Sequence, residues 1–365
     1  STFTDSVIFK NKPLYYTNTL DSLVEFTIPN LKEGRYLLAA VKDVSKNYVF
    51  DPSIDKIDVI SEPITLPNDS LFSLSLFKED PDFAFGRAYQ AGKQRVGFGY
   101  TGSPDFDIVL EGELPDSFAS VVSRDRETDT VYYWYKGIEV DSLKFTLKHN
   151  TLTKSYDYRI RKAEPDSLKV TVVQNGTLQL VDTLKIRTNT PLKDFDVDAI
   201  SLLDKDSVSV PFKLAQNNKH ELQMLFDVFP NENYQLQLLP GAITDFFDVT
   251  HDTLAVKLNT KSRVDYGNLS LRLGNVPSFP IFIDLLDEKE EIKRSIYATE
   301  PRGVFRFAYL RPNKYYIRVR IDENANGKWD TGHYLKKQKP EAVYHFESQL
   351  DVRANWELQE QFILK

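Results

Sequence analysis

Short runs that alternate apolar and polar residues constrain this chain more than any other feature. In residues 315–321, YYIRVRI, every second position is Tyr, Ile or Val, and the positions between them are one Tyr and two Arg. Successive side chains of a β-strand point to opposite faces, so this pattern predicts a strand with one buried face. Similar runs recur along the chain, separated by clusters of Asp, Asn, Ser and Pro, as in stacked β-sandwiches. The sequence therefore predicts an all-β fold of tandem β-sandwich domains.

The two ends of the chain carry related segments. Residues 26–51 align without a gap with residues 305–330, and the apolar alternation of the two segments agrees. The identical positions are Phe26 and Phe305, Leu31 and Leu310, Tyr36 and Tyr315, Asp43 and Asp322, Asn47 and Asn326, and Asp51 and Asp330. A repeat indicates one folding unit that is present twice. We predict four domains, which are residues 1–79, 80–164, 165–262 and 263–365. The first and the last domain are the two copies of the repeated unit, and the first copy looks truncated at its N-terminus beside the second.

Composition excludes several classes of protein. The 365 residues carry a formal net charge of −7, and without a basic surface field we predict no nucleic-acid partner. The chain has no cysteine, which excludes disulfides, thiolate chemistry and cysteine-ligated zinc. No apolar run approaches the roughly 18 residues of a membrane-spanning helix.

Catalytic signatures are missing from the sequence as well. The five histidines are scattered, and neither H-E-x-x-H nor G-x-S-x-G occurs. Residues 97–102, GFGYTG, match the glycine pattern of dinucleotide sites, but they lie in a β-rich run with no helix after them. We interpret them as a bent strand, and we predict that the protein is not an enzyme.

Residues 320–334, RIDENANGKWDTGHY, resemble a calcium loop. Calcium prefers carboxylate, amide and carbonyl oxygens at alternate positions of a tight loop. The predicted ligands are Asp322, Asn324, Asn326 and Asp330, together with the backbone carbonyl of Lys328. His333 stands where a bidentate Glu would close the ligand shell, and imidazole is a poor ligand for this hard cation. The first copy, with Tyr48 in place of the loop glycine, is a weaker candidate.

Two interpretations of this loop remain open. One is a weak calcium site that stiffens the loop without taking part in catalysis. The other is an Asx-rich turn between two strands, in which Asn and Asp side chains bond their own backbone.

Tyr133, Trp134 and Tyr135 form a candidate binding surface. In a strand, alternation buries one aromatic pair and exposes the other, and exposed aromatic rings stack on sugars or dock a partner. The alternative is that these rings pack inside the sheets of the domain.

Triplets of Asp, then Ser or Thr, then an apolar residue recur along the chain. They resemble the O-glycosylation sequon of Bacteroidota envelope proteins. The alternative is a turn in which Asp and Ser cap the entry to a strand, and both interpretations can hold at one site. The candidate acceptors are Ser6, Ser22, Ser70, Thr130, Ser142, Ser167, Thr183, Ser207 and Thr253.

Residues 186–260 resemble the bacterial Ig-like domain named after the S-layer protein SbsA, above all in the stretch NYQLQLLPGAITDFFD. The first and last domains resemble transthyretin-like, carboxypeptidase regulatory-type sandwiches. Over nearly the whole chain, and in the closing residues 334–364, the arrangement resembles a Bacteroidota family of Ig-like-domain envelope lipoproteins. This resemblance implies a signal peptide, a lipidated cysteine and a further N-terminal Ig-like domain, and it assigns no catalytic residue.

On these grounds we predict a non-enzymatic scaffold, built as a rigid rod of four sandwiches. Strings of sandwich domains without acid and base constellations usually hold other proteins in place. The resemblance implies a lipid anchor, N-terminal to this chain, that tethers the protein to the outer membrane on its extracellular face. The predicted partners are subunits of an outer-membrane protein assembly or secretion complex. The alternative is a glycan-binding accessory protein of the cell surface, with the Tyr133–Tyr135 run as the sugar platform.

Overall fold

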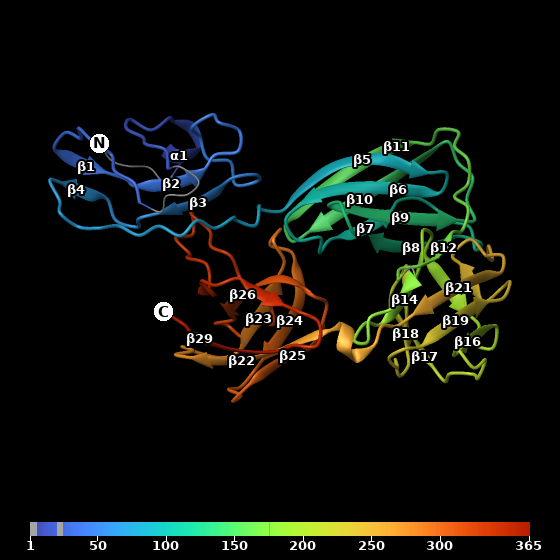
Figure 1. Ribbon diagram of the computed structural model, residues 1–365. Coiled ribbons are helices and arrows are strands. Elements are labelled where there is room, and N and C mark those ends of the chain that lie inside the picture. The colour runs from blue at the N-terminus through green and yellow to red at the C-terminus, as the bar shows by residue number, and fades with distance from the viewer. Residues whose placement is uncertain (1–5, 20–24, 175) are drawn as a thin grey trace.

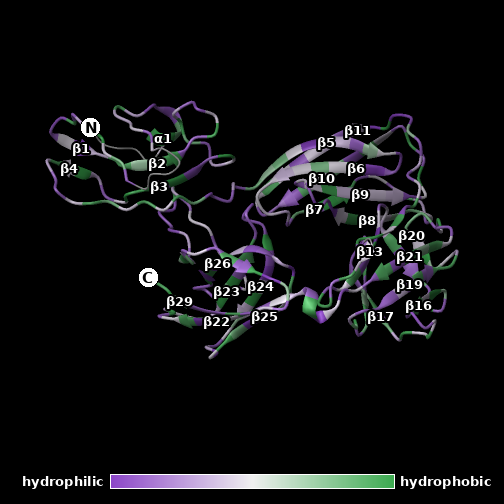
Figure 2. Ribbon diagram, viewed as in Figure 1, coloured by the Kyte–Doolittle hydropathy of each residue, from purple (hydrophilic) through white to green (hydrophobic). Residues whose placement is uncertain are grey.

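β-strands dominate the computed structural model, which describes residues 6–19, 25–174 and 176–365 (Figure 1). Within these residues the helical elements are one turn of α-helix, α1 (Val7–Lys10), and one 3-10 turn, η1 (Arg263–Asp265). Four hydrophobic cores follow one another along the chain. Hydrophobic and hydrophilic residues alternate along the strands (Figure 2). The predicted all-β fold of tandem sandwiches is confirmed.

The first domain is the smallest. Its strands are β1 (Gly34–Tyr36), β2 (Ala39–Lys42), β3 (Lys56–Val59) and β4 (Ile64–Leu66). β1 pairs with β4 and β2 pairs with β3, both antiparallel. Its core is a cluster of the buried side chains Phe50, Ile57, Val59 and Phe77, and Tyr334 from the far end of the chain packs against them.

The second domain is a two-layer sandwich. Its strands are β5 (Ala84–Gly92), β6 (Arg95–Thr101), β7 (Asp107–Leu110), β8 (Ala119–Arg124), β9 (Thr130–Lys136), β10 (Ser142–His149) and β11 (Leu152–Arg159). One sheet has the order β5-β6-β9-β8 and the other β11-β10-β7. Phe98 of the first sheet meets Phe145 of the second, with ring centroids 5.2 Å apart. The GFGYTG run lies almost wholly within β6, so the prediction of a strand there is confirmed.

The third domain pairs two four-stranded sheets. Its strands are β12 (Val170–Val172), β13 (Gly176–Thr177), β14 (Leu184–Thr188), β15 (Leu192–Phe195), β16 (Ile200–Leu203), β17 (Lys213–Asn218), β18 (Glu221–Leu225), β19 (Asn233–Leu238), β20 (Ile243–Asp245) and β21 (Leu254–Asn259). The sheets run β12-β14-β18-β17 and β13-β21-β19-β16, and β15 pairs with β20 beside them. Inward residues such as Ile186 and Leu236 are fully buried between the sheets.

The fourth domain follows η1. Its strands are β22 (Gly267–Gly274), β23 (Ile281–Leu286), β24 (Ile292–Ala298), β25 (Phe305–Leu310), β26 (Asn313–Ile321), β27 (Val343–His345), β28 (Leu350–Val352) and β29 (Glu357–Ile363). One sheet runs β25-β22-β29; the other runs β24-β23-β26-β27, with β28 also pairing with β26. The face of β26 that alternation assigns to the core is buried, from Tyr315 to Ile321.

The internal repeat is confirmed by strand register. In the first domain, β1 pairs Tyr36 with Ile64 and β2 pairs Val41 with Ile57. In the last domain the equivalent positions, Tyr315 and Arg320, both lie on the strand β26. Tyr315 pairs with Leu350, and Arg320 pairs with Val343. The hydroxyl of each repeated tyrosine donates to the carbonyl four residues earlier, at 2.8 Å to Lys32 and 2.9 Å to Arg311. One folding unit therefore recurs down to single hydrogen bonds.

Backbone conformation repeats as well. The turn residues with positive φ come in matching pairs, and the pairs are Asn30 and Tyr309, Lys46 and Ala325, and Tyr48 and Gly327. In the third pair, one copy has a tyrosine where the other has a glycine. Tyr48 adopts φ 64°, a left-handed conformation that favours glycine, where the second copy has Gly327 at φ 78°. The tertiary fold of the repeat thus imposes this turn on a residue poorly suited to it.

The four domains do not extend as a rod. The loop between β26 and β27 reaches from the last domain to the first (Figure 1), where Lys339 forms an ion pair with Asp58 and donates to the carbonyl of Val59 at 3.0 Å. The predicted rod is therefore wrong, because the chain folds back and its end domains touch. Among the described residues, no helix is long and apolar enough to cross a membrane.

Candidate functional site

The loop that follows β26 brings the predicted calcium ligands together around Asp322, which is fully buried. One oxygen of the Asp322 carboxylate accepts the backbone N–H of Asn326 at 3.0 Å. The other accepts the N–H of Gly327 at 2.9 Å and the hydroxyl of Tyr297 at 2.8 Å. Burial raises the pKa of Asp322, but these hydrogen bonds outweigh burial and leave that pKa below its usual value.

The other predicted ligands bond to one another or to the backbone. Asn324 and Asn326 both point their amide nitrogens at the carboxylate of Asp330, at 2.5 and 2.7 Å. The amide oxygen of Asn324 accepts from the N–H of Asn326 at 3.0 Å, and that of Asn326 accepts from the N–H of Lys328 at 2.8 Å. These are Asx turns, in which a side chain replaces a backbone acceptor.

Glu341 closes this loop, and sequence reasoning missed it. Its side chain is buried, and its carboxylate accepts the N–H groups of Glu323 at 2.7 Å, Asn324 at 3.4 Å and Asp330 at 2.8 Å. The indole N–H of Trp329 donates to the Glu341 backbone carbonyl at 3.0 Å. Ten residues separate Asp330 from Glu341, so no loop motif of fixed spacing could have included it.

The first domain repeats this arrangement around Asp43 and Asp55. Asp43 accepts the N–H groups of Asn47 at 3.3 Å and Tyr48 at 2.7 Å, as Asp322 does at the matching positions. Fully buried Asp55 accepts the N–H groups of Val44 at 2.8 Å and Asp51 at 2.9 Å, as Glu341 does. Two carboxylates thus hold the same loop in both copies.

In this geometry the carboxylates face N–H and O–H donors. Such an arrangement stabilises the charge of the carboxylates and closes the loop without a cation. Among the described residues, no three His, Asp or Glu side chains are grouped so as to hold a metal ion. Of the two interpretations, the Asx-rich turn is present in the structure, and the weak calcium site stays a prediction.

His333 does not close the ligand shell. It faces the segment that joins the first two domains, with its ring nitrogens 3.9 Å from Glu79 and 3.8 Å from Asp82. Nearby, the Thr331 hydroxyl donates to the Lys78 carbonyl, and the Tyr334 N–H donates to the Glu79 carboxylate. The rings of Tyr334 and Phe9 lie 5.9 Å apart.

Residues 331–340, which we call the clasp, account for this contact. Three residues separate Asp51 from Asp55 in the first copy, whereas ten separate Asp330 from Glu341 in the second. The extra length of the second copy therefore falls in the clasp, the segment that touches the first domain. Gly332 packs so closely that a Cβ there would lie 2.6 Å from the Phe77 ring.

The candidate binding surface Tyr133–Tyr135 is buried, so the prediction of an exposed platform is wrong. Tyr133 and Tyr135 point into the core of the second domain. Trp134, on the opposite face of β9, is only 1% exposed. It is covered by rings of the third domain, with centroids 5.7 Å away at His220 and 6.2 Å away at Phe247.

Trp134 anchors the joint between the second and third domains. Its indole N–H donates to the hydroxyl oxygen of Ser123 at 2.8 Å, and that oxygen lies 2.9 Å from Nε2 of His220. The guanidinium of Arg95 lies 4.7 Å from the indole centroid. Ser123 and His220 have the spacing of a catalytic pair, but Ser123 is buried and Nδ1 of His220 faces the Thr188 carbonyl at 3.2 Å. The pair therefore lacks an accessible nucleophile and an orienting carboxylate.

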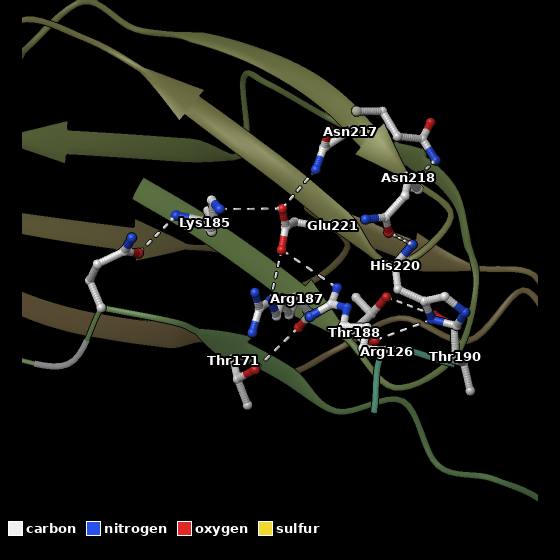
Figure 3. Close-up of polar contacts among 12 residues, drawn as sticks. Arg126, Thr171, Lys185, Arg187, Thr188, Thr190, Asn217, Asn218, His220 and Glu221 are labelled. Carbon is white, nitrogen blue, oxygen red and sulfur yellow. Dashed lines mark hydrogen bonds and ion pairs between the residues drawn. The ribbon is translucent and has the colours of Figure 1, made fainter. Parts of the chain in front are cut away.

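Glu221 carries a second contact across this joint (Figure 3). Its buried carboxylate binds Arg187 at 2.7 Å within the third domain, and Arg126 approaches from the second domain at 3.5 Å. Burial raises the pKa of Glu221, but the hydrogen bonds from Arg187 and Asn217 and the neighbouring positive charges outweigh it, so the pKa is lowered. The site holds two domains together through a satisfied buried charge.

The candidate glycosylation sites differ in exposure. Ser6, Ser70, Ser142, Ser167, Ser207 and Thr253 are exposed, and Thr183 is half-buried. Thr130 is buried at the start of β9, so a glycan cannot be attached there in the folded protein and this candidate is wrong. Ser22 lies outside the described residues.

Comparisons with known proteins give no family. No protein-family model matches the chain, and no curated protein matches its sequence. Among solved structures, titin domains A168–A170 are 9% identical over 76% of this chain and 97% of that chain, with a TM-score of 0.19. The N-terminal four Ig domains of Dscam1 isoform 6.9 are 9% identical over 66% and 75%, with a TM-score of 0.20. Domains 4–9 of the surface layer protein SbsC are 9% identical over 82% of this chain and 53% of that chain, with a TM-score of 0.25. Similarity this weak carries no argument about function.

Proposed function

We propose that the protein is a non-enzymatic scaffold of the bacterial cell surface that holds several domains in a fixed arrangement. The observation that carries this proposal is the way the domains are joined. The clasp binds the last domain to the first, and a buried indole and a buried carboxylate join the second to the third. Packed joints of this kind restrict the relative motion that separate domains otherwise have.

The chemistry of the buried polar groups supports the same proposal. Asp322, Glu341 and Asp55 accept backbone N–H groups, and Glu221 is paired with arginines. These groups stabilise loops and joints, and none of them faces an open position where a substrate could react.

We further propose the setting that the sequence resemblance implies. The protein is an outer-membrane lipoprotein of a Bacteroidota envelope, anchored by a lipid at a cysteine N-terminal to this chain and displayed on the extracellular face. It serves as an accessory subunit of an outer-membrane protein assembly or secretion complex. Its exposed Asp-Ser and Asp-Thr sites carry O-linked glycans.

A purification from detergent-solubilised outer membranes of the native host tests this role. The tagged protein should fractionate with the outer membrane and bring down a reproducible set of membrane proteins. In the Gly332→Ala variant the added methyl group should displace the clasp from the first domain, and this variant should recover less of that set at equal expression. Recovery of the protein from the cytoplasm, or a partner set indifferent to the clasp, would contradict the proposal.

Mass spectrometry of the same preparation tests the modification. Peptides that contain Ser70, Ser142 and Ser207 should carry added hexose-type mass, because these side chains are exposed. The peptide that contains Thr130 should be unmodified. An unmodified protein from the native host would refute the glycan part of the proposal.

A further inference from the structure

A pocket in the fourth domain, beside η1, combines an exposed aromatic ring with a polar array. Its volume is about 270 Å³, and its lining residues are Arg263, Val264, Tyr266, Asn268, Tyr309, Asn355, Trp356 and Glu357. This is slightly smaller than the roughly 300–1,000 Å³ of pockets for drug-sized ligands. A pocket of this size suits a single small ring.

Trp356 supplies a flat apolar face to this pocket. It is 53% exposed, whereas Trp134 is 1% exposed. The guanidinium of Arg353 lies 5.0 Å from the Trp356 ring centroid and is itself paired with Asp351 at 2.7 Å. The Arg353 guanidinium packs against the indole, so this orientation of the ring already has a favourable contact before a ligand binds.

The polar groups beside the indole are also fixed in orientation. The Glu357 carboxylate accepts from Arg306 at 2.7 Å on one oxygen and from the amide of Asn268 at 2.9 Å on the other. The amide oxygen of Asn268 accepts the N–H of Tyr309 at 3.0 Å. The Glu357 oxygens keep lone pairs, and the Asn268 nitrogen keeps a second N–H, for a further partner.

This combination fits a sugar ring. A pyranose ring has a face of C–H groups that packs on an aromatic ring, and hydroxyls at its rim that both donate and accept hydrogen bonds. The Glu357 carboxylate repels an anionic ligand, and its pairing with Arg306 weakens its attraction for a cation, so a neutral ligand fits best beside it. By contrast, the pocket of about 290 Å³ around Gln174 and Lys185 contains no aromatic side chain on which a sugar could stack.

We propose that the pocket around Trp356 binds a neutral pyranose unit of a glycan. Trp356 stacks on the sugar ring, and Glu357 and Asn268 hydrogen-bond its hydroxyls. The site goes beyond the scaffold role and does not depend on it, since it requires neither the clasp nor a membrane partner. Trp134, where an aromatic platform was predicted, is buried in a joint, whereas Trp356 in the last domain is exposed.

The test is saturation-transfer NMR and calorimetry on the full chain with maltotriose, cellotriose, mannotriose and chitotriose. At least one of these sugars should bind with a dissociation constant of millimolar order or tighter. Trp356→Ala should weaken that binding about tenfold or more, and Trp356→Phe should retain part of it. The matched control is Tyr16→Ala, which removes an aromatic ring that is 59% exposed on the first domain and should leave binding unchanged.

Two results of the binding measurements overturn the proposal. One is failure of all four sugars to bind the wild-type chain at about 10 mM, ten times the dissociation constant of a millimolar site. The other is binding that survives Trp356→Ala unchanged. A second measurement on the wild-type chain removes any dependence on folding of the variant. Bound sugar should shield Trp356, the most exposed of the three tryptophans, from fluorescence quenching by acrylamide. Quenching that is unchanged at saturating sugar also overturns the proposal.

Discussion

Removal of the Glu341 carboxylate should destabilise the closed conformation of the loop after β26. In Glu341→Ala the N–H groups of Glu323 and Asp330 lose acceptors at 2.7 and 2.8 Å, and that of Asn324 loses a weaker contact at 3.4 Å. A hydrogen bond to a charged group contributes about 1.5–3 kcal/mol. Two well-formed bonds therefore predict a loss of about 3–6 kcal/mol from the free energy of unfolding of the last domain. This is a large share of the roughly 5–15 kcal/mol that stabilises a domain.

The repeat provides a matched experiment within the same chain. Asp55 makes two bonds of 2.8 and 2.9 Å to the equivalent N–H groups, so Asp55→Ala should destabilise the first domain by a comparable amount. The isosteric variants Glu341→Gln and Asp55→Asn keep one acceptor oxygen, and each should lose about half as much. The two copies thus test one mechanism at two sequence positions that do not align.

Hydrogen exchange resolved by residue is the appropriate assay, because a chain of several domains does not unfold in one two-state step. In Glu341→Ala, the amides of residues 323 and 330 should lose protection, while those of the second domain stay unchanged. Trp329 lies in the loop and donates to the Glu341 backbone carbonyl, so its fluorescence reports the same opening. A loss below about 1 kcal/mol, or protection that survives at residues 323 and 330, would refute the assignment of Glu341 as the residue that closes the loop.

Three further predictions concern the clasp, the joint and the loop. Gly332→Ala places a methyl group 2.6 Å from the Phe77 ring, and this overpacking should lower the free energy of unfolding by about 1–3 kcal/mol. The radius of gyration from small-angle scattering should increase, and an unchanged radius would contradict the role of the clasp. Burial lowers the pKa of His220, the Thr188 carbonyl opposes this shift, and Arg126 and Arg95 add to the lowering. As pH falls, the unfolded chain, in which the pKa of His220 is near 6.5, takes up a proton on this residue at a higher pH than the folded chain does. The free energy of unfolding therefore keeps its full value above about pH 6.5 and decreases below it. His220→Gln should flatten this part of the curve of melting temperature against pH, whereas identical curves would exclude His220 as the cause. Calcium at about ten times its dissociation constant should stabilise the fold by about 1.4 kcal/mol if the loop binds it; this response should vanish in Asp322→Ala, and its absence from the wild type would leave only the Asx turn.

Sequence by itself determined the secondary structure and the repeat. Alternation in residues 315–321 is a local property, since the backbone of any strand sends successive side chains to opposite faces. The match between residues 26–51 and 305–330 indicated a shared unit, and the register of β1 and β2 agrees with that of β26. Asp43 and Asp322 were recognisable because their partners lie four and five residues away, in the same turn.

Only the tertiary structure decided which outward faces are covered and which distant residues complete a site. Alternation placed Trp134 opposite Tyr133, but it carried no information about the third domain that packs over the indole. Glu341 and Asp55 accept the equivalent backbone N–H groups of their loops, but they lie at different separations along the sequence, because the clasp is present in the second copy alone. Contacts of this kind depend on how strands return in space, and a sequence window that ends within one loop cannot contain them.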